Sequence, residues 1–388
     1  MKNTSKLIHS VDHHIESQCK PVKTVNPPLF TGSTVLFDSY EDLMLANSGK
    51  YDGITYGTDR LPTQRAFEEA LNDFENGHLT RAFQSGISAI TNTLLAFTGS
   101  GDHILVCQNV YGPTANFCKK ILTKYNIKTT FVPPAVGADI EKYIEKDTRL
   151  IFLESPGSNT FEIQDIPAIT GLAQAKGIIT VLDNTWATPL YLKPFDLGID
   201  VSVQSVTKYI AGHSDVLLGA VTANEKCSKV FAEYYKVMEI FASPHDCYLA
   251  LRGLKTLPVR LKQHEASALQ IARWLETVEL VDRVIHPALP GHPQHRIWHR
   301  DFSGSSGLFA FTFKENYSDE KLASFVNSLE YYGIGYSWGG FKSLVTAGKF
   351  SRSPESEYYG KIMTRLNIGL EDAEDLMQDL ARGFETLK

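Results

Sequence analysis

Two polar residues stand at the ends of apolar runs that have the pattern of buried strands. Asp183 ends "GIITVLD", and Lys208 directly follows "VSVQSVT". Parallel strands in a covered sheet end at one edge, so we expect both side chains to lie there. A carboxylate buried without a partner is strongly unfavourable. The two residues therefore indicate either a structural ion pair or part of a ligand site.

Pyridoxal phosphate (PLP) is one cofactor that uses such a pair. A lysine condenses with its aldehyde, and an aspartate keeps its ring nitrogen protonated so that the ring accepts electrons. Taken alone, Asp183 and Lys208 leave a structural ion pair about equally open.

A phosphate site is the next feature of the pattern. In "FQSGISAITNTLLAF", Ser85, Gly86 and Ile87 stand where a helix begins, and free N–H groups there favour a phosphate. Ser205 and Thr207 alternate along the strand that leads to Lys208, so both hydroxyls can reach the same group. Taken alone, the first three residues are better explained by an ordinary helix cap.

Two further residues have types that suit a cofactor and its substrate. Tyr111, in "NVYGPT" after a predicted strand, can stack on a flat ring, although loop packing also explains it. Arg365 lies in "MTRLNIGLED", and its guanidinium suits bidentate binding of a carboxylate. A surface arginine on a strand is the alternative.

Short apolar runs alternate with helical patterns between residues 64 and 225, which predicts a mostly parallel sheet with helices on both faces. The predicted helices are 63–77, 87–97, 111–126, 138–146 and 166–177. The predicted strands are 102–108, 128–134, 149–155, 178–184, 201–207 and 216–223. A long helix is expected from about residue 246, followed by strands at 307–313 and 363–370 and helices at 319–330 and 371–387. We therefore predict an N-terminal arm (1–60) that contacts a neighbouring subunit, a large domain (61–255) and a small C-terminal α/β domain (256–388).

Composition excludes several classes of protein. The chain of 388 residues is 43% hydrophobic and 21% charged with a formal net charge of -6, which argues against a nucleic-acid or anionic-membrane surface. Five widely spaced cysteines without a C-x-x-C pair favour free thiols over a disulfide framework or zinc site. The N-terminus lacks the apolar stretch of a signal peptide. We expect a cytoplasmic protein without a transmembrane span.

Several longer motifs resemble one enzyme family. They are "SVTKYIAGHSDVLLGAV", "LESPGS", "VLDNTWATP", "HPALPG", "DFSGSSGLFAF", "YSWGG" and "RLNIGLED". From about residue 50 to the C-terminus the sequence is similar to the trans-sulfuration family of PLP enzymes, the cystathionine lyases and synthases. The resemblance implies fold type I, the aspartate-aminotransferase-like fold, in a homotetramer built from dimers that share their active sites. It also implies roles for several residues above. Lys208 binds PLP covalently, Asp183 contacts the ring nitrogen and Tyr111 stacks on the ring. The phosphate is bound by Gly86, Ile87, Ser205 and Thr207, and the substrate carboxylate by Arg365.

The motif "YSWGG" resembles the version found in bacterial β-lyases of this family. It contains Tyr336, Ser337 and Trp338, which the resemblance places against the substrate, with Ser337 orienting the carboxylate. Members that act at the γ-carbon usually carry a small or aliphatic residue at the position of Trp338. The implied activity is cleavage of L-cystathionine to homocysteine, pyruvate and ammonia, a step of methionine biosynthesis. A γ-lyase or γ-synthase, a broader cysteine-conjugate β-lyase, and a PLP-binding regulatory protein with vestigial activity are the alternatives.

Two positions depart from the family pattern. The family commonly has Tyr-x-Arg in its N-terminal segment, where both residues reach the neighbour's phosphate. "TYGTDRLPT" keeps Tyr56 but has Thr58 at the arginine position, so Arg60 is a candidate substitute. In "GGFKSL", Lys342 stands where glutamate is usual.

The histidines of "HPQHRIWHR" do not predict a metal site. His292, His295 and His299 have suitable spacing, but no carboxylate or cysteine pattern completes a set of ligands. We interpret the segment as a solvated loop.

Overall fold

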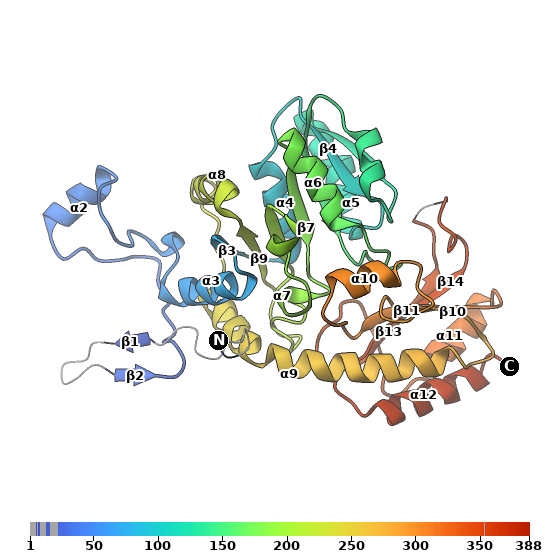
Figure 1. Cartoon of the computed structure of the whole chain (residues 1–388). Helices are drawn as coiled ribbons and strands as arrows, with labels where there is room; N and C mark the ends of the chain where they lie inside the picture. The colour runs from blue at the N-terminus through green and yellow to red at the C-terminus, as the bar shows by residue number, and fades with distance from the viewer. Residues whose placement is uncertain (1–4, 6, 8–12, 16–21, 353) are drawn as a thin grey trace.

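Two β-sheets and one long helix organise the chain (Figure 1). The computed structural model describes residues 5, 7, 13–15, 22–352 and 354–388. A seven-stranded sheet lies in the middle of the molecule, and a five-stranded sheet lies toward the C-terminus. Helix α9 (Pro244–Leu275) runs along the base of both sheets in Figure 1 and joins them. The predicted boundary at residue 255 falls inside this helix.

The large sheet has the strand order β3-β9-β8-β7-β6-β4-β5. Its members are β3 (Leu79–Phe83), β4 (His103–Cys107), β5 (Lys128–Val132), β6 (Thr148–Glu154), β7 (Ile179–Asp183), β8 (Val201–Gln204) and β9 (Gly219–Ala223). The five strands from β8 to β5 run parallel, whereas β9 is antiparallel to both β8 and β3. The prediction of a mostly parallel sheet is confirmed.

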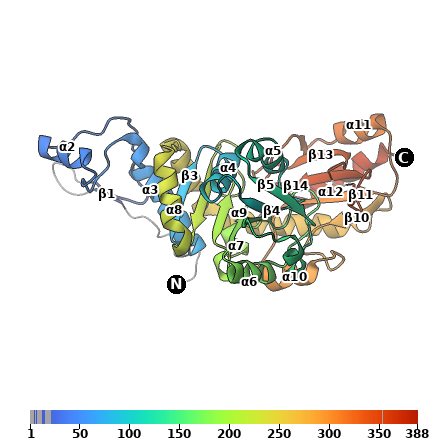
Figure 2. The same cartoon turned by 90° about the horizontal axis from the view of Figure 1, so that it is seen from above.

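Helices cover both faces of this sheet. They are α3 (Pro62–Glu75), α4 (Gly86–Ala96), α5 (Gly112–Lys120), α6 (Ile166–Lys176), α7 (Thr188–Tyr191) and α8 (Glu225–Val237). In Figure 2, α4 and α5 lie on one side of the sheet, and α6 and α7 lie on the other. Because both faces are covered, every residue of β4 and β8 is buried, which explains their apolar runs.

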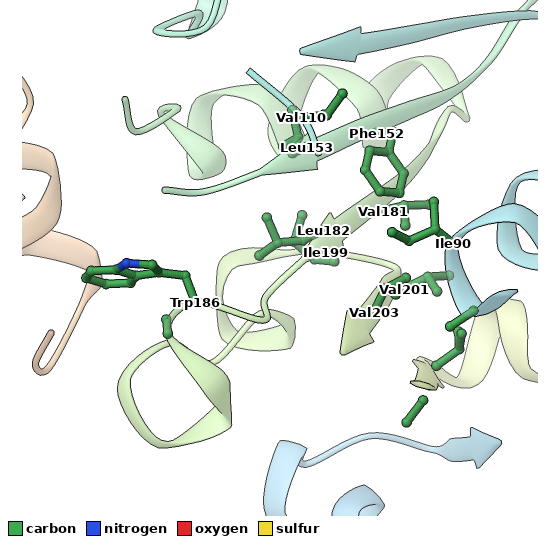
Figure 3. Close-up of a cluster of buried hydrophobic side chains, with 14 of the residues drawn as sticks. Ile90, Val110, Phe152, Leu153, Val181, Leu182, Trp186, Ile199, Val201 and Val203 are labelled. Carbon is green, nitrogen blue, oxygen red and sulfur yellow. The ribbon is translucent and has the colours of Figure 1, made fainter. Parts of the chain in front are cut away.

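The core of the large sheet packs side chains from neighbouring strands against α4. Figure 3 shows Phe152 of β6, Val181 of β7, Val203 of β8 and Ile90 of α4 in one cluster. Trp186 lies apart from this cluster in Figure 3, and its indole N–H donates to the carbonyl of Leu308 at 2.9 Å. This side chain therefore links the end of β7 to the small sheet.

The small sheet has the order β10-β11-β14-β13-β12. Its strands are β10 (Val281–Ile285), β11 (Leu308–Phe313), β12 (Gly333–Ile334), β13 (Leu344–Lys349) and β14 (Ile362–Asn367). Helices α11 (Asp319–Asn327) and α12 (Ala373–Glu385) pack in this part, whereas α10 (His295–Asp301) packs Ile297 and Trp298 against the core of the large sheet. A second core fills this part, in which Phe325 of α11 stacks on Phe384 of α12 with ring centroids 5.2 Å apart.

The N-terminal segment projects away from both sheets in Figures 1 and 2. Strands β1 (His13–Ile15) and β2 (Val22–Thr24) pair antiparallel, and α2 (Tyr40–Asn47) has no buried residue. Most of residues 1–21, and with them the beginning of the predicted arm, lie outside the described part of the chain.

Some predicted elements differ from the observed ones. The predicted helix 138–146 is the 3-10 helix Ala138–Tyr143, and the predicted helix 111–126 is divided into α5 and the 3-10 helix Leu122–Tyr125. Strand β3 and helix α8 were not predicted. The interpretation of "HPQHRIWHR" as a solvated loop is wrong, because His292 is buried and α10 begins at His295. Within the described residues, no helix is both long and apolar enough to cross a bilayer.

Candidate active site

The parallel strands bring polar residues together at one edge of the large sheet. Glu154 and Asp183 end β6 and β7, and they are partners in the register of that strand pair. Lys208 lies four residues beyond the end of β8, the next strand, in a turn closed by its N–H donating to the carbonyl of Ser205. The sheet edge predicted to hold Asp183 and Lys208 therefore also holds a second carboxylate, that of Glu154.

A cavity of about 360 Å³ opens at this edge, between the large and the small sheet. This is within the usual size of a small-molecule site. Nearly all of the predicted cofactor and substrate residues line it, together with others that were not predicted. The lining residues are Ser85, Gly86, Ile87, Ile90, Tyr111, Glu154, Pro156, Gly157, Ser158, Asn159, Phe161, Asp183, Thr185, Trp186, Ser205, Thr207, Lys208, Leu217, Leu308, Tyr336, Ser337, Trp338 and Arg365.

Lys208 is held by residues of the loop that contains Trp338. Its ammonium donates to the hydroxyl of Ser337 at 2.9 Å and lies 5.6 Å from the centroid of the Trp338 ring. Burial and the positive charge of Arg365 lower the pKa of Lys208 to about 8, against the opposing effect of Asp183. A lysine with this pKa can give up its proton near neutral pH and act as a base or nucleophile.

The Asp183 carboxylate is fixed by Thr185. Its Oδ1 accepts from the Thr185 N–H at 3.0 Å and from the Thr185 hydroxyl, and that hydroxyl in turn accepts from the Ser205 N–H at 2.8 Å. Burial raises the pKa of Asp183, while these hydrogen bonds and the charge of Lys208 oppose the rise. Such a carboxylate is strongly stabilised by a cation, and the protonated nitrogen of a pyridine ring is one.

Helix α4 points its N-terminus into the cavity. Ser85 caps the helix by accepting from the Ser88 N–H at 3.1 Å, and Gly86 and Ile87 follow at the first turn. A Cβ on Gly86 would lie 2.5 Å from the Ser205 hydroxyl oxygen and 2.7 Å from its Cβ, so only glycine allows the helix to approach the end of β8 this closely. The Thr207 hydroxyl, which also lines this end, exchanges hydrogen bonds with the backbone of Leu218. This cradle fits a phosphate group.

Arg365 enters the cavity from β14 of the small sheet. Its Nη1 donates to the side-chain oxygen of Asn159 at 3.4 Å, and within the described residues no carboxylate lies at ion-pair distance from it. Asn159 has a left-handed backbone conformation (φ 70°), which asparagine tolerates better than most residues. The guanidinium is thus available to a carboxylate ligand, as its sequence motif predicts.

The loop with Tyr336, Ser337 and Trp338 forms the cavity wall on the side of the small sheet. Trp338 packs on Tyr209 with ring centroids 5.4 Å apart, and Tyr336 is almost fully exposed. Gly339, with φ 83°, lies so close to the lysine turn that a Cβ would be 2.8 Å from the Tyr209 nitrogen. This close approach places Ser337 and Trp338 against Lys208.

Two predicted cofactor residues do not reach the cavity of their own chain. Tyr56 is half exposed and lies on the arm, and Arg60 donates through Nε to the buried carboxylate of Glu68 at 2.9 Å. Arg81 lies on the same carboxylate, at 3.5 Å. The prediction that Tyr56 and Arg60 bind phosphate concerns a second copy of the chain, and it stays a prediction. Lys342 lies outside the cavity lining and is exposed.

Several lining residues were not assigned from the sequence. Glu154 stands in the quoted motif "LESPGS" at a strand end, which is the same signal that identified Asp183. Thr185 and Asn159 gave no comparable signal, because their importance comes from contacts between separate loops. Among the described residues, no three histidine, cysteine or acidic side chains gather as metal ligands.

Comparison with known proteins gives a consistent result. Residues 8–385 match the family described as "Cys/Met metabolism PLP-dependent enzyme". The chain is 39% identical to the cystathionine beta-lyase MetC of Escherichia coli, over 93% of each chain. It is 40% identical to an L-alanine/L-glutamate racemase of Wolbachia pipientis, over 92% of this chain and 91% of the relative.

A solved structure shows the same architecture. The crystal structure of metB from Corynebacterium glutamicum superimposes with a TM-score of 0.90 and is 27% identical, covering all of this chain and 99% of the other. The fold type implied by the sequence motifs is confirmed by this likeness.

Proposed function

The chain belongs to the family of Cys/Met metabolism PLP-dependent enzymes, and from this we propose that it is a carbon–sulfur β-lyase that cleaves L-cystathionine to homocysteine, pyruvate and ammonia. The family predicted from the sequence, and with it the PLP cofactor, is confirmed. The observation that supports β-cleavage is Trp338, whose ring lies beside Lys208 and narrows the cavity. The proposed place of the reaction is methionine biosynthesis.

The residues of the cavity fit PLP. Ser85, Gly86 and Ile87 at the start of α4 would hold its phosphate together with Ser205 and Thr207. Lys208 would bind its aldehyde and Asp183 its ring nitrogen. When bound, PLP supplies an electron-accepting ring that stabilises negative charge at the substrate α-carbon.

The protein's own groups would orient the substrate and move its protons. Arg365, with Asn159 and Ser337 nearby, would hold the α-carboxylate and so fix the α-hydrogen toward Lys208. Lys208, with its lowered pKa, would take the α-proton. Asp183, fixed by Thr185, would keep the ring nitrogen protonated. Lys208 or Tyr111 would then protonate the leaving sulfur as the thiol departs.

Product analysis tests this proposal directly. The PLP-loaded protein is incubated with L-cystathionine, and the 2-oxoacid and thiol are identified by mass spectrometry. Pyruvate with homocysteine is the expected result. Formation of 2-oxobutyrate with cysteine would instead make the protein a γ-lyase, and the absence of any oxoacid would favour a synthase, another β-thio amino acid or a regulatory role.

Racemisation is a second candidate activity, because the Wolbachia relative is named a racemase and is as similar to this chain as the β-lyase relative. Both reactions begin with removal of the α-proton, so one set of residues can serve them. Chiral analysis after incubation with L-alanine distinguishes the two. Formation of D-alanine at a rate above that of cystathionine cleavage would favour the racemase.

We further propose a homotetramer built from dimers, located in the cytoplasm. The exposed α2 and the apolar side chains around it, such as Leu36 and Tyr40, support a covering subunit. Four of the five cysteines are described, and all four are free and buried, which is consistent with a reducing compartment.

A further inference from the structure

One arginine of the small-sheet side reaches loops of the large sheet. Arg352 lies between β13 and β14, yet its Nη1 donates to the carbonyl oxygens of Val110 and Ser158, each at 3.1 Å. Both carbonyls immediately precede residues that line the cavity, Tyr111 and Asn159. Arg352 itself is not among the lining residues, so its hydrogen bonds act on the site through these neighbours.

The peptide group in front of Tyr111 is held at both ends. Its carbonyl, from Val110, accepts from Arg352, and its N–H, from Tyr111, donates to the Glu154 carboxylate at 2.6 Å. Because a peptide group is planar and includes the next Cα, fixing both its oxygen and its hydrogen also fixes the position of the Tyr111 Cα, from which the side chain reaches the cavity. Hydrogen bonds to ionised groups are the strong ones, and the bond from the Arg352 guanidinium is of that kind.

The second acceptor of Arg352, the Ser158 carbonyl, holds the backbone in front of Asn159. The Ser158 carbonyl belongs to the peptide group that enters Asn159, whose φ of 70° depends on its surroundings. Asn159 in turn accepts from Arg365. One guanidinium therefore holds the backbone on which both the tyrosine and the partner of Arg365 depend.

The charges around this arrangement are complementary. Burial and the neighbouring charge of Asp183 raise the pKa of Glu154 to about 8, against the opposing effects of the Tyr111 N–H, the Ser158 side chain and the charge of Arg352. The positive charge of Arg352 also faces Glu162. The charge of Arg352 thus opposes part of the rise that burial and Asp183 cause in the pKa of Glu154.

We infer that Arg352 and Glu154 act as a clamp between the two sheets that positions Tyr111 and Asn159 for the cofactor and the substrate. Arg352 is a positioning residue, since it touches neither of them. The inference rests on the proposed function only in assigning Tyr111 to the cofactor ring and Arg365 to a substrate carboxylate. It does not depend on which carbon–sulfur bond is cleaved.

The test compares Arg352→Gln with Arg283→Gln. Arg283, in β10, donates to Glu357 at 2.7 Å and to Tyr358, so its substitution removes arginine contacts with the segment that follows Arg352 but none with the loops of Tyr111 and Asn159. For each variant we would measure the dissociation constant for PLP, the visible circular dichroism of the bound cofactor, KM, kcat and the melting temperature. Arg352→Gln is expected to raise both the PLP dissociation constant and KM about tenfold, the size expected for loss of one charge-assisted hydrogen bond to each loop. Arg283→Gln should leave all of them unchanged.

Two further variants keep the test decisive if Arg352→Gln folds poorly. Arg352→Lys retains the charge, but its side chain is shorter than that of arginine and its ammonium must reach the position of Nη1 to contact both carbonyls, so an intermediate effect is expected. Glu154→Gln can still accept from the Tyr111 N–H without charge, and combining it with Arg352→Gln should cost less than the two single effects added together.

Three results would overturn the clamp. They are a PLP affinity and KM of Arg352→Gln equal to those of Arg283→Gln, a fall in melting temperature alone, or wild-type behaviour of Arg352→Lys. If L-cystathionine is not cleaved at all, the PLP dissociation constant and the circular dichroism still decide the matter, so failure of the proposed function is distinguishable from failure of the clamp.

Discussion

Lys208 combines a reactive amine with a nearby positive charge, and this makes its titration informative. Its pKa is lowered to about 8 from an ordinary value of 10.5, first by burial and then by Arg365. In the PLP-free protein, the rate of PLP attachment should therefore rise with pH to a half-maximum near 8, as the neutral amine forms. Stopped-flow absorbance would measure this rate.

Arg365 provides the matched variants for this measurement. Arg365→Gln removes the positive charge and should shift the half-maximum to higher pH, whereas Arg365→Lys retains the charge and should leave it close to 8. A half-maximum near 10.5 in the wild-type protein would contradict the assignment. The lowered pKa of Lys208 also affects the stability of the fold. Between pH 8 and 10.5 the unfolded chain holds more protons at this lysine than the folded chain does. The contribution of Lys208 to the free energy of unfolding therefore becomes more favourable to the folded state as the pH rises through this range.

At the scale of residues, the sequence allows prediction of the site residues that stand at strand ends, but not of those whose side chains connect separate loops. Asp183 and Lys208 are visible because a charged side chain interrupts an apolar run. Thr185, Asn159 and Arg352 stand in polar surroundings, where one more polar residue carries no signal. Their contacts join positions from 20 to 242 residues apart, which only the folded chain brings together.

At the scale of elements, the loop of Trp338 depends on two adjacent glycines in different ways. A Cβ on Gly339 would meet backbone atoms of Lys208 and Tyr209 at 2.9 and 2.8 Å, and φ there is 83°. A Cβ on Gly340 would meet the hydroxyl of Ser214, which is the end of a side chain that can rotate. Comparing an alanine at position 339 with one at position 340 therefore separates the effect of a backbone clash from the effect of a clash with a movable side chain.

We expect Gly339→Ala to be much more damaging than Gly340→Ala. A left-handed alanine alone costs about 1 kcal/mol or more, and the backbone contact adds to this by pushing Ser337 and Trp338 away from Lys208. The free energy of unfolding should fall by about 2 kcal/mol and kcat/KM by about tenfold or more, whereas Gly340→Ala should cost under about 1 kcal/mol. Denaturant titration and steady-state kinetics would measure both. Equal effects of the two substitutions would contradict this account of the loop.

The helices and strands that the sequence predicts correctly are those with long helical or fully apolar patterns. The buried parallel strands and α9 were found because burial on both faces, or many helical turns, leaves an unmistakable pattern. Strand β3 reads "LTRAF", with Arg81 inside it, and it is a strand because it pairs with β9 across the sheet. Register with a distant partner, not local composition, decides such an element.

At the scale of the whole molecule, the projecting arm explains why one chain does not hold a complete set of predicted cofactor residues. Tyr56 lies on the arm outside the cavity, and Arg60 is occupied by Glu68, so neither can meet a phosphate in the same chain. At the phosphate end, the cavity of one chain is lined by helix α4 and hydroxyl groups. If Tyr56 completes the cradle of a neighbour, each site contains groups from two chains.

Subunit complementation distinguishes a shared site from a separate one. Lys208→Ala removes the reactive lysine, and Tyr56→Ala removes the arm tyrosine, so each variant alone should be strongly impaired. In a hybrid dimer, the Tyr56→Ala chain keeps its own Lys208 and receives Tyr56 from the Lys208→Ala chain, which restores one intact site. Random mixing by co-refolding or co-expression should therefore recover about a quarter of the wild-type activity. If Tyr56 served its own chain, both sites of the hybrid would remain defective, and the mixture would show no more activity than the two variants assayed apart.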